Sequence, residues 1–158
     1  MRIALDGCDG VGKTSVAEKL ANKVGCNIVR LTYKGDRSIA AYASMMSVDN
    51  VVHDRTFISE IVYPKYFKRA SRLSAASIPA LFELIEQYGV QMFILTGSDE
   101  TIIERISKRG DEFINNMDDF IKINHDYLDI AKQFGYIVID TTNKSIDEVV
   151  EEIGGYLK

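Results

Sequence analysis

The stretch Gly7-Cys8-Asp9-Gly10-Val11-Gly12-Lys13-Thr14 decides the fold, because it matches the pattern G-x-x-x-x-G-K-T at every fixed position. Its glycines permit a tight turn whose successive N–H groups face a phosphate, and a helix beginning near Lys13 points the positive end of its dipole at the same anion. Lys13 can bridge the β- and γ-oxygens, and Thr14 can hold Mg²⁺. The motif therefore predicts a binding site for a nucleoside triphosphate.

The donor nucleotide is expected to be ATP with Mg²⁺, bound mainly by the loop and by the first turn of the helix after it. The residues assigned to this binding are Gly7, Asp9, Gly10, Val11, Gly12, Lys13, Thr14 and Ser15. Asn143, which follows a late apolar run, is expected to touch the donor adenine from its own loop.

Short apolar runs alternate with longer helical patterns along the rest of the chain. Strands are predicted at 3–5, 27–32, 50–53, 91–95 and 136–139, and helices at 13–24, 37–46, from 57, 78–88, from 98, 111–134 and from 145. Strands that are apolar throughout, with a helix between each pair, indicate a parallel sheet covered on both faces. The prediction is an α/β fold of three layers and about five strands, in a single domain over residues 1–158.

Composition excludes several classes of protein. The chain carries 19 Lys and Arg against 23 Asp and Glu, and this net charge of −4 argues against a protein that coats DNA or a membrane. Cys8 and Cys26 are too few for a disulfide framework or a zinc site, so a reducing compartment is expected. No apolar run approaches the roughly 18 residues of a spanning helix. The chain enters a strand at once, which leaves no room for a signal peptide, so we expect a soluble cytoplasmic protein.

The loop alone does not identify the phosphoryl acceptor, because GTPases, mechanical ATPases and small-molecule kinases share it. A GTPase would carry Asn-Lys-x-Asp, but Asn143-Lys144 is followed by Ser145-Ile146. A mechanical ATPase would close an apolar strand with an acidic residue, and Val51-Val52-His53-Asp54 fits that pattern only loosely. The size of the chain favours a small kinase, with a nucleotide-binding switch ATPase as the non-enzyme alternative.

The chain resembles thymidylate kinase and related nucleotide kinases in four places. The first is the loop at 5–14, and the second is Asp54-Arg55 followed by Ser59 and Tyr63. The third is the strand 92–95 with the helix that bears Arg105 and Arg109. The fourth is made of Phe120, Tyr127 and Leu128 together with Ile139-Asp140-Thr141-Thr142. The resemblance implies a P-loop kinase fold with strand order 2-3-1-4-5 and transfer of the γ-phosphoryl group of ATP to a pyrimidine deoxynucleotide. The chain is shorter than those kinases. Residues 31–35 stand where those kinases have Arg-Glu-Pro-Gly, which leaves the acceptor open.

Asp54 and Arg55 close the third strand, where strand ends of a parallel sheet line the ligand crevice. Asp54 can hold Mg²⁺ through water, and Arg55 can fork onto the phosphate of an acceptor. If the two residues formed only a surface ion pair, the motif would have no functional meaning. By resemblance, Asp9 would accept a hydrogen bond from the 3′-hydroxyl of the acceptor. Asp6, at the end of the first strand, fits a metal-site role and a structural role equally well.

Arg105, Lys108 and Arg109 stand at helical spacing, so one helix end presents all three cations. Val11 leaves the phosphate loop without an arginine of its own. We therefore expect Arg105 and Arg109 to bring positive charge to the transferring phosphoryl group, as part of a short lid around residues 105–116. The alternative is that these cations only suit the dipole at the helix C-terminus.

Two further sets of residues are candidates for contacts with the acceptor. One is basic and would form a stripe along a helix: Lys65, Lys68, Arg69 and Arg72. Such a stripe is usually a solvated face, and the alternatives are binding of the acceptor or contact with a polynucleotide. The other set could stack on a base, although most aromatic residues at these spacings belong to a core: Tyr33, Tyr42, Tyr63, Tyr66 and Phe67.

The predicted reaction is phosphoryl transfer from ATP to a deoxynucleoside monophosphate, with dTMP or a related pyrimidine favoured. Lys13, Arg55, Arg105 and Arg109 are the predicted catalytic residues, and Thr14 and Asp54 the predicted metal ligands. A deoxynucleoside kinase and a kinase acting on a nucleic acid or a modified base stay open as alternatives. The expected partners are nucleotide substrates and not a membrane, and a homodimer is left open.

Overall fold

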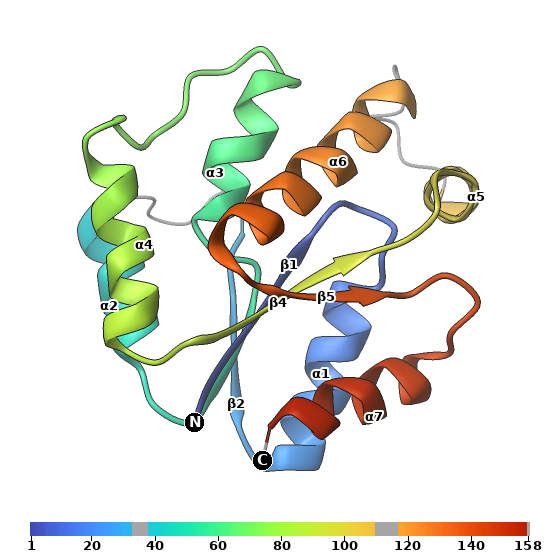
Figure 1. The fold of residues 1–158 in the computed structure, drawn as a ribbon, viewed down its shortest axis with the longest axis horizontal. Coiled ribbons are helices and arrows are strands. Elements are labelled where there is room, and N and C mark those ends of the chain that lie inside the picture. The colour runs from blue at the N-terminus through green and yellow to red at the C-terminus, as the bar shows by residue number, and fades with distance from the viewer. Residues whose placement is uncertain (33–37, 110–116, 158) are drawn as a thin grey trace.

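A computed structural model describes residues 1–32, 38–109 and 117–157, and its centre is a five-stranded sheet (Figure 1). The strands are β1 (Arg2–Gly7), β2 (Asn27–Arg30), β3 (Val51–Asp54), β4 (Gln91–Thr96) and β5 (Ile137–Asp140). They lie in the order β2-β3-β1-β4-β5, and every pairing is parallel. The predicted α/β class and the strand order implied by the resemblance are therefore confirmed.

Helices cover both faces of this sheet (Figure 1). On one face α1 (Lys13–Val24) packs against α7 (Ile146–Tyr156), and on the other lie α2 (Ile39–Ser47), α3 (Ile58–Val62), α4 (Ser77–Gln87) and α6 (Met117–Phe134). α5 (Asp99–Arg109) follows β4 and packs beside the loop after β1, since a Cβ placed on Gly10 would lie 3.1 Å from the Ile106 side chain. Among the described helices, none is long and apolar enough to cross a bilayer.

Capping residues set where the helices near the phosphate loop begin and end. α1 stops at Gly25, whose φ of 70° is left-handed and whose N–H donates to the carbonyl of Ala21. α7 opens with a capping box, in which Ser145 Oγ accepts from the N–H of Glu148 and the Glu148 carboxylate accepts from the N–H of Ser145. Ser98 Oγ accepts from the N–H of Thr101 at the start of α5. All three caps agree with the sequence pattern.

The prediction of a second basic stripe on a helix is wrong. α3 ends at Val62, and a short 3₁₀ turn, η1 (Tyr63–Lys65), follows it. Pro64 has no N–H to donate to the carbonyl of Glu60, and Ser71 Oγ donates to that carbonyl instead, at 2.9 Å. The chain therefore leaves the helical path before Lys68, Arg69 and Arg72 are reached.

Two members of that basic set are engaged in ion pairs. Arg69 forks onto the fully buried carboxylate of Glu60, with N–O distances of 2.9 and 3.1 Å. Lys65 pairs with Asp126 on α6 at 2.9 Å. These contacts hold the chain after α3 against its neighbours, which is a structural role that helical spacing did not indicate.

Some predicted boundaries differ from the structure. β2 ends at Arg30, although the N–H of Leu31 still donates to the carbonyl of Asp54 at 3.1 Å. β5 begins at Ile137 and continues to Asp140. The helix predicted over 111–134 is described from Met117 onward. Residues 110–116, which belong to the predicted lid, and residues 33–37, which include Tyr33, lie outside the described residues.

Candidate active site

The loop between β1 and α1 has the backbone conformation that its glycines allow. Gly7, Gly10 and Gly12 have φ values of 142°, 85° and 83°, a region that other residues rarely adopt. Gly7 also lies against β4, where a Cβ would come within 2.2 Å of the carbonyl oxygen of Leu95. The loop leads directly into α1, whose first residue is Lys13, so the free N–H groups of a helix N-terminus lie at the loop.

Lys13 lies inside this loop, only 5% exposed, and its ammonium donates to the carbonyl of Cys8. Burial lowers the pKa of Lys13 to about 8, and the charge of Arg55 acts in the same direction, while Asp9 acts against both. Lys13 is therefore mostly charged at neutral pH. A buried charge attracts phosphate oxygens more strongly than one that water screens.

Thr14 and Asp54 are in contact at the first turn of α1. The Thr14 hydroxyl donates to Asp54 Oδ2 at 2.8 Å, and the same carboxylate oxygen accepts from Arg30 Nε at 3.2 Å. Asp54 is 3% exposed, whereas Thr14 is exposed to solvent. A hydroxyl and a carboxylate are the ligands that Mg²⁺ takes in phosphoryl-transfer sites, alongside water and phosphate oxygens. The donor atoms of the two predicted metal residues therefore fit Mg²⁺.

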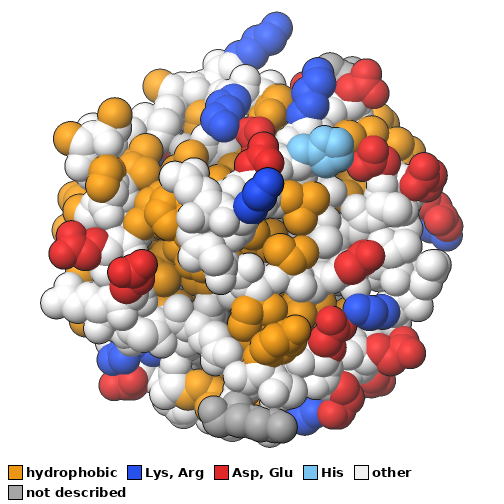
Figure 2. Space-filling model, in the orientation of Figure 1, with side chains coloured by type: hydrophobic (Ala, Val, Ile, Leu, Met, Phe, Trp, Pro, Cys, Tyr) orange, Lys and Arg blue, Asp and Glu red, His pale blue; other side chains and the backbone are white. Residues whose placement is uncertain are grey.

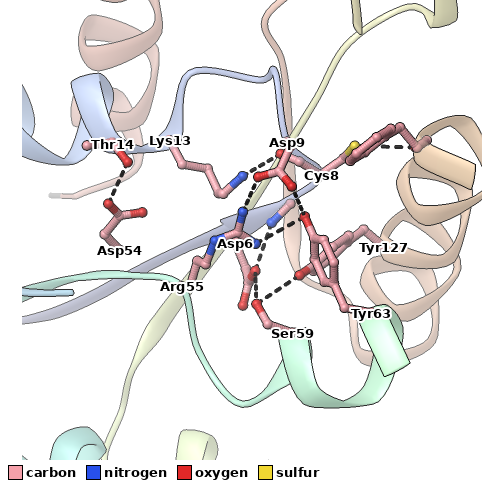
Figure 3. A network of polar contacts seen from close by, with 12 residues as sticks. Asp6, Cys8, Asp9, Lys13, Thr14, Asp54, Arg55, Ser59, Tyr63 and Tyr127 are labelled. Carbon is pink, nitrogen blue, oxygen red and sulfur yellow. Dashed lines mark hydrogen bonds and ion pairs between the residues drawn. The ribbon is translucent and has the colours of Figure 1, made fainter. Parts of the chain in front are cut away.

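A second charged cluster lies on the other side of Lys13, as Figure 3 shows. Arg55 pairs with Asp9 through Nη2 and donates from Nη1 to the Tyr63 hydroxyl at 3.1 Å. The Tyr63 hydroxyl in turn donates to Asp9 Oδ2 at 3.1 Å. Burial by itself would raise the pKa of Asp9, but the charges of Arg55 and Lys13 hold it below its ordinary value. Asp9 is therefore an ionised acceptor at neutral pH.

The backbone at Arg55 helps to place this side chain. Its φ of 77° is left-handed, which is unusual for any residue except glycine, while its N–H donates to the carbonyl of Leu5 at 2.9 Å. The guanidinium carbon lies 5.0 Å from the centre of the Tyr63 ring. Strained backbone of this kind costs on the order of 1–3 kcal/mol and concentrates at functional sites. The turn after β3 thus brings the arginine beside the phosphate loop.

Asp6 has a structural role. Its carboxylate accepts from the N–H and the hydroxyl of Thr56, at 2.8 and 2.7 Å, and from Ser59 Oγ at 3.3 Å. Ser59 Oγ also shares a hydrogen bond of 3.1 Å with the Tyr127 hydroxyl of α6. Asp6 therefore fixes the turn that carries Arg55 and the start of α3 against β1 (Figure 3).

A cavity of about 360 Å³ opens on the α7 side of the loop. The residues that line it are Gly10, Val11, Gly12, Val16, Arg105, Lys108, Arg109, Thr141, Lys144, Ser145, Ile146 and Val149. Asn143 is exposed and does not line the cavity, but its loop does so through Thr141 and Lys144, and the predicted contact of this loop with the adenine stays a prediction. Sequence reasoning did not assign four of these residues to the site, although the capping box at Ser145 marks a helix start after β5: Lys144, Ser145, Ile146 and Val149.

The two predicted lid arginines lie in different surroundings. Arg105 donates to the hydroxyl and to the carbonyl of Thr141, at 2.9 Å each, and lies 3.4 Å from the carbonyl of Gly10. Arg109 lines the same cavity one turn later, at the last residue of α5. Arg105 thus connects α5, the end of β5 and the phosphate loop, while Arg109 lies at the edge of the cavity.

Aromatic side chains border the cluster of Asp9, Arg55 and Tyr63. The Tyr63 ring stacks on Phe67 with a centroid distance of 5.7 Å, and Phe67 meets Phe120 edge to face at 6.2 Å. Phe67 is 40% exposed, so part of an aromatic side chain near the charged cluster is open to solvent. The other predicted stacking candidates are placed elsewhere, since Tyr42 is buried in the core and the Tyr66 hydroxyl donates to Asp126.

Comparison with known proteins places the chain among nucleotide kinases. It is 28% identical to a protein of Methanocaldococcus jannaschii named "Probable thymidylate kinase", over 100% of this chain and 96% of that protein. It is 33% identical to a Pyrococcus furiosus protein named "Putative adenylate kinase", over 97% of this chain and 82% of that protein. No family model matches the sequence.

Solved structures agree with the sequence relatives. The YorR protein of Bacillus subtilis, crystallised in complex with phosphorylated GDP, superposes with a TM-score of 0.84 at 25% identity, covering 99% of this chain and 95% of that one. Deoxyadenosine kinase from M. mycoides superposes with a TM-score of 0.68 at 18% identity, which shows a shared fold.

Proposed function

The chain belongs to the P-loop nucleoside monophosphate kinase family, and on this premise we propose that it transfers the γ-phosphoryl group of ATP to a deoxynucleoside monophosphate, with dTMP or a related pyrimidine as the favoured acceptor. The observation that carries the proposal is the position of Arg55 beside Lys13 and Asp9. A guanidinium has five N–H donors, of which Asp9 and Tyr63 take two. The fork can therefore still bind a phosphate on the acceptor.

The donor side of this proposal is formed by the phosphate loop and the cavity next to it. The loop N–H groups and Lys13 would bind the β- and γ-phosphates, with the nucleoside in the cavity beside α7. Thr14 and Asp54 would hold Mg²⁺, which neutralises charge on the phosphate oxygens when it is bound with ATP. Lys13 lies between this side and Arg55, so donor and acceptor phosphates would meet at its ammonium (Figure 3).

Positive charge and positioning are what phosphoryl transfer requires of a protein. Lys13 would supply one charge where the two phosphates meet and Arg55 one on the acceptor side, and Arg109 at the end of α5 would supply a third. The exposed part of Phe67, which stacks on Tyr63, would contact the base or the sugar of the acceptor. The relative from M. jannaschii, named a probable thymidylate kinase, supports the choice of a thymidine nucleotide.

A deoxynucleoside kinase is the second candidate, and the Asp9–Arg55 pair favours it. Because Asp9 neutralises part of the charge of Arg55, an uncharged acceptor is also compatible with the cluster. In that reaction the Asp9 carboxylate would take the proton of the attacking hydroxyl as a general base.

Release of ADP from ATP, measured with a panel of acceptors, tests the proposal. The panel contains the four deoxynucleoside monophosphates, the matching nucleosides and an oligonucleotide. We expect a monophosphate to give the highest kcat/KM, and Lys13→Ala to lower its turnover at least about 10²-fold, as removal of one preorganised charge does. Equal rates with and without every acceptor would contradict kinase activity toward this class.

A further inference from the structure

The donor cavity presents apolar side chains on its α1 and α7 side. Val11 and Val16 come from the phosphate loop and α1, and Ile146 and Val149 from the first turn of α7. Three of them are buried, while Ile146 is 41% exposed at the rim. Ile146 therefore offers most of the apolar surface, and an aliphatic side chain packs on the flat face of any purine without distinguishing adenine from guanine.

The two hydroxyl groups in the lining are already engaged within the protein. Thr141 Oγ1 donates to the carbonyl of Thr96 at 2.8 Å and accepts from Arg105 at 2.9 Å. Ser145 Oγ donates to the Glu148 carboxylate at 2.8 Å and accepts from the N–H of Glu148 at 3.2 Å. Since each hydroxyl has one hydrogen to donate, neither can donate to a base while these bonds hold.

The remaining polar side chains in the lining are cations, namely Arg105, Lys108, Arg109 and Lys144. Cations donate hydrogen bonds and accept none. In the part of the chain that the structure describes, no Asp, Glu, Asn or Gln side chain lines the cavity. The lining therefore offers a base no carboxylate or amide acceptor, and its remaining side-chain acceptors are the second lone pairs of the Thr141 and Ser145 hydroxyls, which suit the amino group of adenine and N1–H of guanine alike. Donor groups suit adenine N7 as well as guanine N7 and O6.

We propose that this cavity is permissive for the donor base, so that GTP serves as a phosphoryl donor nearly as well as ATP. The proposal rests on the proposed function, because it assumes that the cavity holds the donor nucleoside. Sites that hydrogen-bond a substrate group reject an analogue lacking it by about 10⁴–10⁵, whereas apolar pockets discriminate only about 10–200-fold. Without a side chain that accepts from one base and not from the other, we expect the ratio of the dissociation constants of GTP and ATP to lie at or below the low end of the second range, about tenfold.

Displacement of a fluorescent ATP analogue by ATP or by GTP, with Mg²⁺ and without any acceptor, measures this ratio directly. The wild-type protein should give a ratio below about tenfold. A larger ratio in favour of ATP would overturn the proposal and leave the proposed function standing. If neither triphosphate binds, the donor site of the proposed function fails, and the base specificity fails with it.

The variant Ile146→Asp tests whether the base lies where the lining indicates. Ile146 is the first residue of α7, where a carboxylate suits the helix dipole, so the variant should fold. The new carboxylate can accept from guanine N1–H and the guanine amino group, and should shift the ratio toward GTP by about fivefold or more. The neighbouring Asp147→Asn, outside the lining, should leave the ratio unchanged. An unchanged ratio in Ile146→Asp would contradict this placement of the base.

Discussion

Arg105 on α5 donates two hydrogen bonds of 2.9 Å to Thr141, one to its hydroxyl and one to its carbonyl. Because Thr141 also donates to the carbonyl of Thr96, the arginine joins α5 to the ends of β4 and β5. Arg109 lies one turn further along α5 and lines the same cavity. The two arginines, equivalent by spacing, therefore have different predicted contributions to the reaction.

Arg109→Ala should lower kcat by on the order of 10³-fold, the scale of an arginine that stabilises the transferring phosphoryl group. Its KM for ATP should stay within a few fold. Arg105→Ala should mainly raise the KM for ATP and lower the melting temperature, since it removes charged hydrogen bonds worth about 1.5–3 kcal/mol each. Steady-state kinetics and thermal unfolding of both variants separate these effects. A wild-type kcat in Arg109→Ala would show that this cation only interacts with the dipole at the C-terminus of α5 and has no role in the reaction.

Asp54→Asn should lower the affinity of the active site for Mg²⁺. The carboxylate accepts from Thr14 and is buried, so its loss should raise the Mg²⁺ concentration for half-maximal rate by about 10–100-fold, the range seen when a residue supporting a metal site is changed. Rates of ADP formation across a Mg²⁺ titration measure the shift. Arg30→Gln is the matched control, because Arg30 contacts the same carboxylate from the solvent side. If the aspartate variant follows the wild-type titration, Asp54 is not part of the metal site.

Arg55→Ala should reduce kcat/KM for the monophosphate by about 2–3 kcal/mol, or 30-fold to 150-fold, because a charged hydrogen-bonding partner of the phosphate is lost. Binding of ATP should change little. Tyr63→Phe keeps the ring under the guanidinium and removes only the hydroxyl contacts, so its effect should be smaller. Kinetics with a monophosphate and with the matching nucleoside compare the variants. An equal loss of ATP affinity in Arg55→Ala would place the arginine in the donor site.

The affinity for ATP should fall as the pH rises above about 8, where burial has placed the pKa of Lys13. The triphosphate stabilises the charged ammonium and so raises this pKa, which means that binding takes up a proton in that pH range. Calorimetry at pH 9 in two buffers of different ionisation enthalpy should detect the uptake. The variant Lys13→Met should bind ATP without this proton uptake. An affinity that is constant between pH 7 and 9.5 would contradict the shifted pKa.

The sequence was informative wherever local chemistry determines the backbone. The glycines of 7–12, the caps at Gly25 and Ser145 and the apolar strands led to the right elements along the chain, and the resemblance implied the right strand order in the sheet. The phosphate loop and the pairing of Thr14 with Asp54 follow from the same patterns, because strand ends of a parallel sheet meet at one edge.

Long-range contacts were beyond such reasoning. Helical spacing placed Arg69 on a solvated face, whereas its partner Glu60 is a buried carboxylate reached only because the helix stops near Pro64. The attachment of Arg105 to Thr141 depends on how the β5–α7 loop packs, and no local pattern reports that packing. These are the positions where tertiary contacts override sequence spacing.

A single reaction with γ-labelled ATP, Mg²⁺ and equal concentrations of dTMP and thymidine tests the proposed acceptor most directly. Arg55 beside Lys13 and Asp9 predicts that the label enters the β-phosphate of dTDP, with little in dTMP. Label that accumulates in dTMP instead would show that the hydroxyl of a nucleoside is the acceptor, and would contradict the assignment of Arg55 to an acceptor phosphate.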